Sequence, residues 1–135
     1  MKISFVGYKG NSVNIFPALA KNLSKKISGL ELEQRFAPFL EDLPIIALEC
    51  AENADFVLVF ALTEEEEEAD FIKQKLIDVE LASKTRILKY VQTDGFSGKS
   101  IDSQTDLIQE TVDNISSTIL SILFNESDFE PEEKY

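Results

Sequence analysis

FVLVFALTEEEEE, at residues 56–68, joins an apolar run directly to a run of carboxylates. The first seven residues show no polar alternation, which is typical of a central strand buried on both faces of a parallel sheet. Thr63 and Glu66 have the spacing of a capping box, which predicts that a helix begins directly after this strand. In an open α/β sheet, ligands bind at such junctions, beyond the carboxyl end of the strand. The chain supplies its own anions at this helix start, which disfavours a phosphate ligand there.

The residues on either side of this stretch alternate between strand and helix patterns. Strands are predicted at residues 2–7, 30–36, 56–62 and 86–92, and helices at residues 15–28, 43–52, 64–83 and 107–123. Asp42 is expected to cap the second helix, and residues 93–103 are expected to form a loop.

Connections of this length between strands are crossover helices, so the order predicts one α/β domain. The expected fold is a three-layer α/β/α sandwich, flavodoxin-like or lumazine-synthase-like, whose four-stranded parallel sheet has the order 2-1-3-4. The domain is expected to span residues 1–124. Residues 125–135 are rich in acids and are expected to form a frayed C-terminal tail.

The composition disfavours several classes of function. The chain has 135 residues, a net charge of −12 and no histidine. The negative charge argues against nucleic acid as a partner, because phosphate binding requires clustered Lys and Arg. The absence of histidine excludes Ser-His-Asp and Cys-His catalysis as well as histidine-ligated metals. A general acid or base in this chain therefore has to be Asp, Glu, Lys or Tyr.

The sequence also predicts where the protein resides. No apolar run approaches the roughly 20 residues that a membrane helix needs, so no membrane partner is expected. The single cysteine, Cys50, fits a reducing compartment, and its apolar neighbours predict a buried, inert thiol. Adjacent glutamates on a helix point in different directions, so residues 64–68 are interpreted as a solvated helix start and not as a metal site. We expect a cytoplasmic protein.

The loops that follow the strands are expected to converge on one edge of the sheet. In the first loop, a plain polar turn is the favoured interpretation, and the alternative is that Tyr8 and Asn11 offer a ring and an amide to a flat, neutral ligand. In the second loop, Phe39 and Leu40 are interpreted as a pocket wall, a subunit contact or a cover for a helix end. Arg35, near a strand end, is the candidate for binding a substrate oxygen.

Two stretches carry a family resemblance. Residues 35–44 read RFAPFLEDLP, and residues 55–62 read DFVLVFAL. With an arginine, a loop close to VPGxxDLP, a helix and a strand ending in Ala-Leu, the chain resembles archaeal-type riboflavin synthase, a relative of lumazine synthase. Val79–Ala82 stands about where that family has a His-Glu-Ala segment. The last helix ends ILSILF at residues 119–124, similar to the closing helix of the family.

The resemblance implies a transferase that joins two ribityllumazines into riboflavin by exchanging a four-carbon unit. It implies no metal and no organic cofactor, and an assembly into rings such as pentamers, with sites between neighbouring subunits. Arg35 and Asp42 would contact the substrate, and Glu80 would act as acid and base. The chain departs from the family in three places: its first loop lacks an arginine, Thr63 stands where the family has a glycine after Ala-Leu, and the family's histidine is Val79 or absent.

Three functions remain open from the sequence. The first is the lumazine-handling transferase. The second is a catalytically silent, ring-forming relative that binds a lumazine-like or flavin-like molecule, or that has a structural role. The third is a receiver-like or flavin-binding module, which is disfavoured because the first strand ends Val6-Gly7 without acids and no Ser/Thr-rich phosphate loop follows it.

Overall fold

All four predicted strands form, and they pair in the predicted order. The computed structural model describes residues 1–125 and contains one parallel sheet with the strand order β2-β1-β3-β4. The strands are β1 (Lys2–Tyr8), β2 (Glu31–Ala37), β3 (Phe56–Thr63) and β4 (Arg86–Thr93). The helices are α1 (Phe16–Lys26), the 3-10 turn η1 (Leu40–Asp42), α2 (Leu43–Ala51), α3 (Glu66–Ser83), α4 (Ile101–Leu120) and the π-helical turn η2 (Ser121–Asn125).

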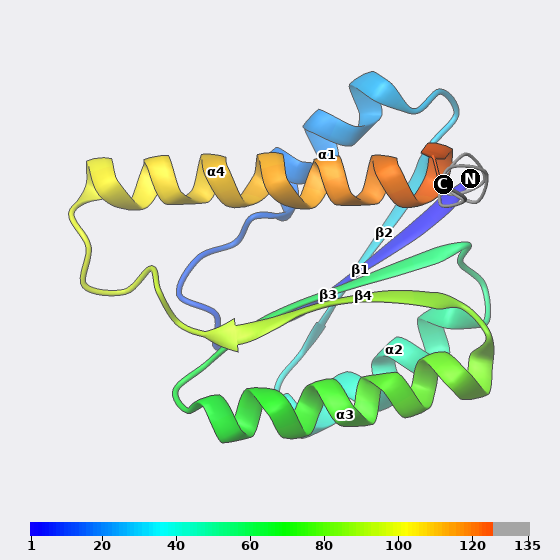
Figure 1. Cartoon of the computed structure of the whole chain (residues 1–135), viewed down its shortest axis with the longest axis horizontal. Coiled ribbons are helices and arrows are strands. Elements are labelled where there is room, and N and C mark those ends of the chain that lie inside the picture. The colour runs from blue at the N-terminus through cyan, green and yellow to red at the C-terminus, as the bar shows by residue number, and fades with distance from the viewer. Residues whose placement is uncertain (126–135) are drawn as a thin grey trace, which may run out of the picture.

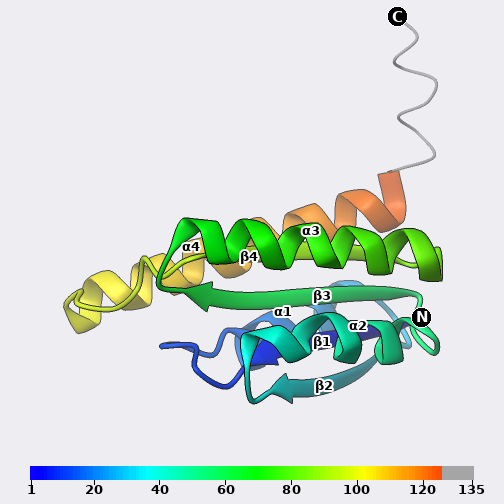
Figure 2. The same ribbon diagram turned by 90° about the horizontal axis from the view of Figure 1, so that it is seen from below.

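The helices form a layer on each face of the sheet, which confirms the predicted three-layer α/β/α sandwich. Helices α1 and α4 cover one face, and α2 and α3 cover the other (Figure 1). The four strands lie side by side between these layers, with β2 and β4 at the edges (Figure 2). Because all four strands are parallel, their carboxyl ends lie together at one end of the sheet, which we call the carboxyl edge. The first turns of α4, in yellow, extend past this edge (Figure 1).

Strand β3 is buried along its whole length, and its two faces carry side chains of different size. Its larger side chains pack against α1 and α4; they are Phe56, Leu58, Phe60 and Leu62. Its smaller ones pack against α2 and α3; they are Val57, Val59 and Ala61. Burial of each large apolar side chain stabilises the fold by roughly 1.5–3 kcal/mol. The missing polar alternation thus reflects a strand that contributes to both cores.

The predicted capping box at the start of α3 is wrong. Thr63 is the last residue of β3, where it pairs with Thr93 and is only 2% exposed. Its hydroxyl donates to the carbonyl oxygen of Glu65 at 3.0 Å, and α3 begins at Glu66 without a side-chain cap. The ladder to β4 extends the strand by one residue, so the helix starts later than the pattern predicted.

Two further boundaries differ from the prediction. Asp42 occupies the N-cap position of α2, but its side chain makes no capping bond, because η1 runs straight into α2 with helical backbone angles. Helix α4 begins at Ile101, inside the predicted loop 93–103, and the hydroxyl of its N-cap Ser100 accepts from the backbone N–H of Ser103. The first turns of α4 have no apolar periodicity because they extend beyond the sheet, and Ile101 is 83% exposed.

The predicted acidic tail lies almost wholly outside the described residues. Asn125 is the last residue of η2, and residues 126–135 follow it in the sequence. Among the helices that the structure describes, none combines the length and apolarity needed to cross a membrane.

Candidate functional site

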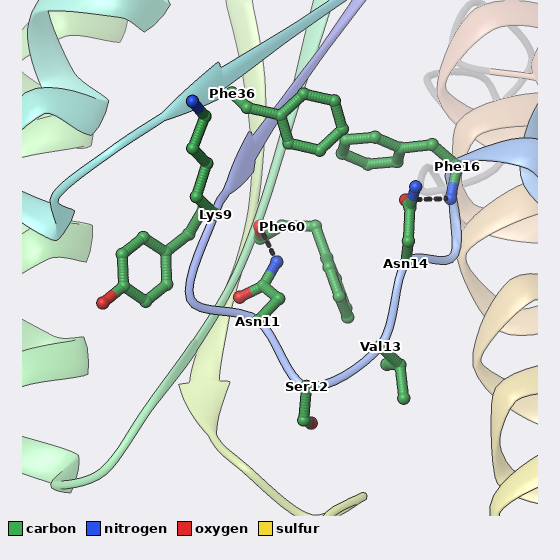
Figure 3. A pocket seen from close by; sticks show the side chains of 9 residues that line it. Lys9, Asn11, Ser12, Val13, Asn14, Phe16, Phe36 and Phe60 are labelled. Carbon is green, nitrogen blue, oxygen red and sulfur yellow. Dashed lines mark hydrogen bonds between the residues drawn. The ribbon is translucent and has the colours of Figure 1, made fainter.

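A pocket opens at the carboxyl edge of the sheet, beside the ends of β1 and β3. The crossover through α1 and the crossover through α2 lie on opposite faces, so the strand order reverses between β1 and β3. The pocket, which we call the aromatic pocket, has a volume of about 490 Å³ (Figure 3). It is lined by Tyr8, Lys9, Asn11, Ser12, Val13, Asn14, Phe16, Phe36 and Phe60.

A row of aromatic residues beside the pocket is interrupted by one residue without a side chain. The strand register places Phe36, Gly7, Phe60 and Tyr90 side by side across the sheet. The three aromatic side chains of this row lie on the face covered by α1 and α4. Gly7 leaves a gap in the row between Phe36 and Phe60, and aromatic ring atoms lie close above it.

Phe16, the first residue of α1, fills part of this gap. Its ring centroid lies 5.7 Å from that of Phe36 and 6.4 Å from that of Phe60. A Cβ atom on Gly7 would approach the rings of Phe16 and Phe36 to 2.9 Å, so any larger residue would displace them. Phe36 is 38% exposed, and its ring lies beside that of Phe16 at the edge of the pocket (Figure 3).

Asn11 extends the hydrogen bonding of β3 beyond the end of β1. Its side-chain N–H donates to the Phe60 carbonyl at 3.1 Å, and its side-chain oxygen accepts from the Leu62 N–H at 2.7 Å. The Asn11 amide thus replaces the backbone of a strand residue and holds the loop after β1 against the sheet. The Tyr8 ring lies over Gly10 in the same loop, and a Cβ there would lie 2.5 Å from the ring, so Tyr8 would have to move.

A second pocket, which we call the acidic pocket, shares Tyr8 and Ser12 with the first. Its volume is about 380 Å³. The remaining lining residues are Gly10, Leu40, Leu62, Thr63, Glu64, Glu65, Glu68, Asp94 and Ser97. Across residues 1–125, no three Asp, Glu or Cys side chains are arranged to hold a metal ion.

Asp94 organises the loop on the far side of the acidic pocket. It accepts from the backbone N–H of Phe96 at 2.8 Å and from the hydroxyl of Ser97 at 2.7 Å. Partial burial alone would raise the pKa of Asp94, but the hydrogen bonds from Ser97, Phe96 and Ser12 outweigh it and hold that pKa below its ordinary value. Asp94 is therefore a carboxylate at neutral pH, and the contact with Ser12 connects the loops after β1 and β4.

The two adjacent pockets differ in charge. No carboxylate lines the aromatic pocket, and Lys9 is its one charged lining residue. The Lys9 side chain extends from the loop after β1 toward β2 (Figure 3). Four carboxylates line the acidic pocket, and no basic residue does. An aromatic ligand that is neutral or anionic therefore suits the aromatic pocket better than a cation.

The predicted site residues do not all come together. Tyr8 and Asn11 line the aromatic pocket, as expected. Phe39 is 63% exposed in the loop after β2, and Asp42 ends η1; neither lines the two pockets. Arg35 forms an ion pair with Glu49 of α2, with an N–O distance of 2.9 Å, on the opposite face of β2 from Phe36. Arg35, Asp42 and Phe39 thus lie outside the aromatic pocket of the single chain.

Glu80 lies at the opposite edge of the sheet. It is in the last turns of α3 and accepts from the Lys89 ammonium at 2.7 Å and from the Ile87 N–H at 2.8 Å, at the start of β4. Partial burial would raise the pKa of Glu80, but the bonds from Lys89 and Ile87 outweigh this effect and lower the pKa. Within one chain, Glu80 is a structural carboxylate far along β4 from the aromatic pocket.

Cys50 is buried, as the sequence predicts. It is 3% exposed in the core between the sheet and α2. Burial raises the pKa of its thiol, so the nucleophilic thiolate is disfavoured.

The sequence prediction named two of the nine lining residues of the aromatic pocket, Tyr8 and Asn11, and missed the aromatic ones, Phe16, Phe36 and Phe60. Phe36 and Phe60 were assigned to strands, and only the register shows that they flank Gly7. The sequence feature that could have revealed these residues is that three neighbouring strands each carry an aromatic residue or a glycine near the carboxyl end.

We predict that Gly7→Ala destabilises the fold and reduces the aromatic pocket. The added methyl group meets two aromatic rings at 2.9 Å, and overpacking of this kind costs about 2 kcal/mol. Urea unfolding measures the change. Gly95→Ala is the matched control, because its Cβ would have no neighbour within 4 Å. Equal effects of the two substitutions would contradict this account of the pocket.

We predict that Asn11→Ala costs about 2 kcal/mol and exposes the end of β3, because the Phe60 carbonyl and the Leu62 N–H lose their partner. Hydrogen exchange of the Leu62 amide is expected to accelerate. Asn14→Ala is the control; the Asn14 side chain accepts one bond, from the Phe16 N–H, and leaves the β3 ladder intact. An unchanged Leu62 amide in Asn11→Ala would refute the role given to Asn11.

We predict that Glu80→Gln lowers stability by about 1 kcal/mol at pH 7. Because the pKa of Glu80 is lower in the folded than in the unfolded chain, its contribution is full above the unfolded pKa of about 4.3 and disappears as the pH falls through the folded pKa. Urea unfolding from pH 7 to pH 3 should show the difference between wild type and variant shrinking toward zero. Glu67→Gln, at an exposed position of α3, is the control that removes the same charge, and it is expected to cost less at pH 7. A difference between wild type and Glu80→Gln that stays constant over this pH range would contradict the role given to Glu80.

The comparison with known proteins shows a similarity of fold. No protein-family model matches the chain, and no curated protein matches it. Fifteen solved chains match it in structure. One is the MID domain of the Argonaute protein QDE-2 from N. crassa, with 12% sequence identity, a TM-score of 0.50 and coverage of 87% of this chain and 96% of that chain. At this identity the likeness shows a common α/β architecture and nothing finer.

Proposed function

We propose that this protein binds a flat aromatic molecule of the lumazine or flavin type in the aromatic pocket. The observation that carries the proposal is a pocket of about 490 Å³ at the ends of β1 and β3, whose lining includes the aromatic residues Phe16, Phe36 and Phe60. Aromatic rings offer stacked or edge contacts to a planar ligand. The location, at the reversal of strand order, is where open α/β sheets bind ligands.

The charge of the lining narrows the ligand class. Lys9 stands at the edge of the aromatic pocket and no carboxylate lines it, so a neutral or anionic ring is favoured. Tyr8 and Ser12 also line the acidic pocket, so substituents of the ligand can reach its carboxylates from the aromatic pocket. Hydroxyl groups, such as those of a ribityl chain, are suitable donors to these carboxylates.

The transferase activity is a narrower proposal that is supported by the family resemblance alone. Glu80 lies at the other edge of the sheet, so acid–base catalysis by this residue requires a neighbouring subunit to bring it to the aromatic pocket. This agrees with the sites between subunits that the resemblance implies. Binding by a single chain requires no such assembly, and we therefore place binding first.

Fluorescence titration tests the proposal with riboflavin and ribityllumazine as probes. We expect saturable binding by the wild type and about tenfold weaker binding by Phe36→Ala, which removes one ring contact. Phe71→Ala is the matched control, because Phe71 is 61% exposed on α3, on the other face of the sheet. Absence of saturable binding, or equal loss in both variants, would exclude the aromatic pocket as the site. Riboflavin formed from ribityllumazine would support the transferase as well.

A further inference from the structure

The charges of this chain are unevenly distributed. Residues 1–30 contain five lysines and no Asp or Glu, whereas residues 31–135 contain eight basic and 25 acidic residues. Three of the five lysines, Lys21, Lys25 and Lys26, lie on α1. In a protein with a net charge of −12, one helix therefore carries a locally positive surface.

These three lysines line a groove between α1 and α4, which we call the lysine groove. Its volume is about 540 Å³, and its other lining residues are Ala18, Asn22, Gln109 and Val112. The groove walls are held together by α1–α4 packing and by the Ser116 hydroxyl, which donates to the Asn22 side-chain oxygen at 3.2 Å. No carboxylate lines the groove.

The lysines are available for an anionic partner. All three side chains are exposed, and none forms an ion pair with another of residues 1–125. Lys73 and Lys89, on the α3 side of the sheet, each pair with a carboxylate. The lysine groove thus concentrates unpaired positive charge along one channel.

We propose that the lysine groove binds the acidic segment 126–135 of the same chain. This segment contains five carboxylate side chains and one lysine, so its charge is opposite to that of the groove. It follows η2, which directly continues α4, and α4 forms one wall of the groove. The segment therefore starts from the helix to which it would return.

The length of the segment is sufficient. From Asn125 back to Gln109 the distance along the helix is about 24 Å at 1.5 Å per residue. Ten extended residues reach about 33 Å, which covers this distance and leaves length for the turn. Attachment to the same chain gives the segment an effective concentration in the millimolar range, which favours it over free anions. The contact is electrostatic and exposed, so salt weakens it.

Paramagnetic relaxation in the full-length protein tests the proposal. A nitroxide is attached to Ser127→Cys; Cys50 is buried and stays unlabelled. At low salt, we expect the amides of residues 18–26 and 109–112 to lose half or more of their signal intensity. This loss should disappear at high salt and in the triple variant Lys21→Gln, Lys25→Gln, Lys26→Gln. The matched control, Lys73→Gln, Lys75→Gln, Lys99→Gln, removes the same charge elsewhere and should keep the loss.

Three results would overturn the proposal. The first is intensity loss that is absent, or spread evenly over the surface. The second is intensity loss that arises only between molecules. It would be seen when spin-labelled protein is mixed with isotope-labelled protein that carries no nitroxide, and it would make a second copy of the chain the occupant. The third is an unoccupied groove whose amides shift only when inorganic polyphosphate is added, which would make it a site for an external anion.

Discussion

The candidate site depends on the register of three parallel strands. Because Gly7 pairs with Phe36 on one side and with Phe60 on the other, the one residue of this row without a side chain lies between two aromatic residues. A shift of one residue in either ladder would turn Phe36 or Phe60 to the opposite face and place another side chain beside Gly7. The burial of β3 on both faces fixes this register, since a slip would exchange its large and small faces between the two cores.

Hydrogen bonds hold the loop after β1 against the neighbouring strands. Asn11 bonds the backbone of β3 on both sides of Ala61, and the N–H of Lys9 donates to the carbonyl of Ala37 at the end of β2. The loop is thus attached to both neighbours of β1. Tyr8 and Ser12 line both the aromatic pocket and the acidic pocket, so this attachment fixes the segment that the two pockets share. A polar side chain predicted as a ligand contact is therefore mainly a structural element of the site.

The sequence predicted the sheet and its order because the information is local and strong. The apolar run of β3 and the helical periodicities on either side suffice to place the elements, and the crossover rules then order them. The aromatic pocket could be predicted only in part. Tyr8 and Asn11 are in a predicted loop after a strand, where ligand contacts are expected, whereas the sequence gives Phe36 and Phe60 only as strand residues. Thr63 and Asp42 failed as caps for a related reason. Each had the right residue type, but strand pairing and a 3-10 turn determined its backbone.

The pKa shifts of the titratable groups indicate which carboxylates have a structural role in a single chain. A general acid or base needs a pKa near the working pH. Among the described groups with a resolved shift, Asp94 is the one at this edge, and its hydrogen bonds lower its pKa, so it remains ionised and structural. Glu80 is stabilised as a carboxylate in the same way at the opposite edge. Both carboxylates thus hold loops and strands in place through their hydrogen bonds. The edge between β1 and β3 therefore offers an aromatic surface and one lysine to a ligand, while the two carboxylates with lowered pKa have structural partners.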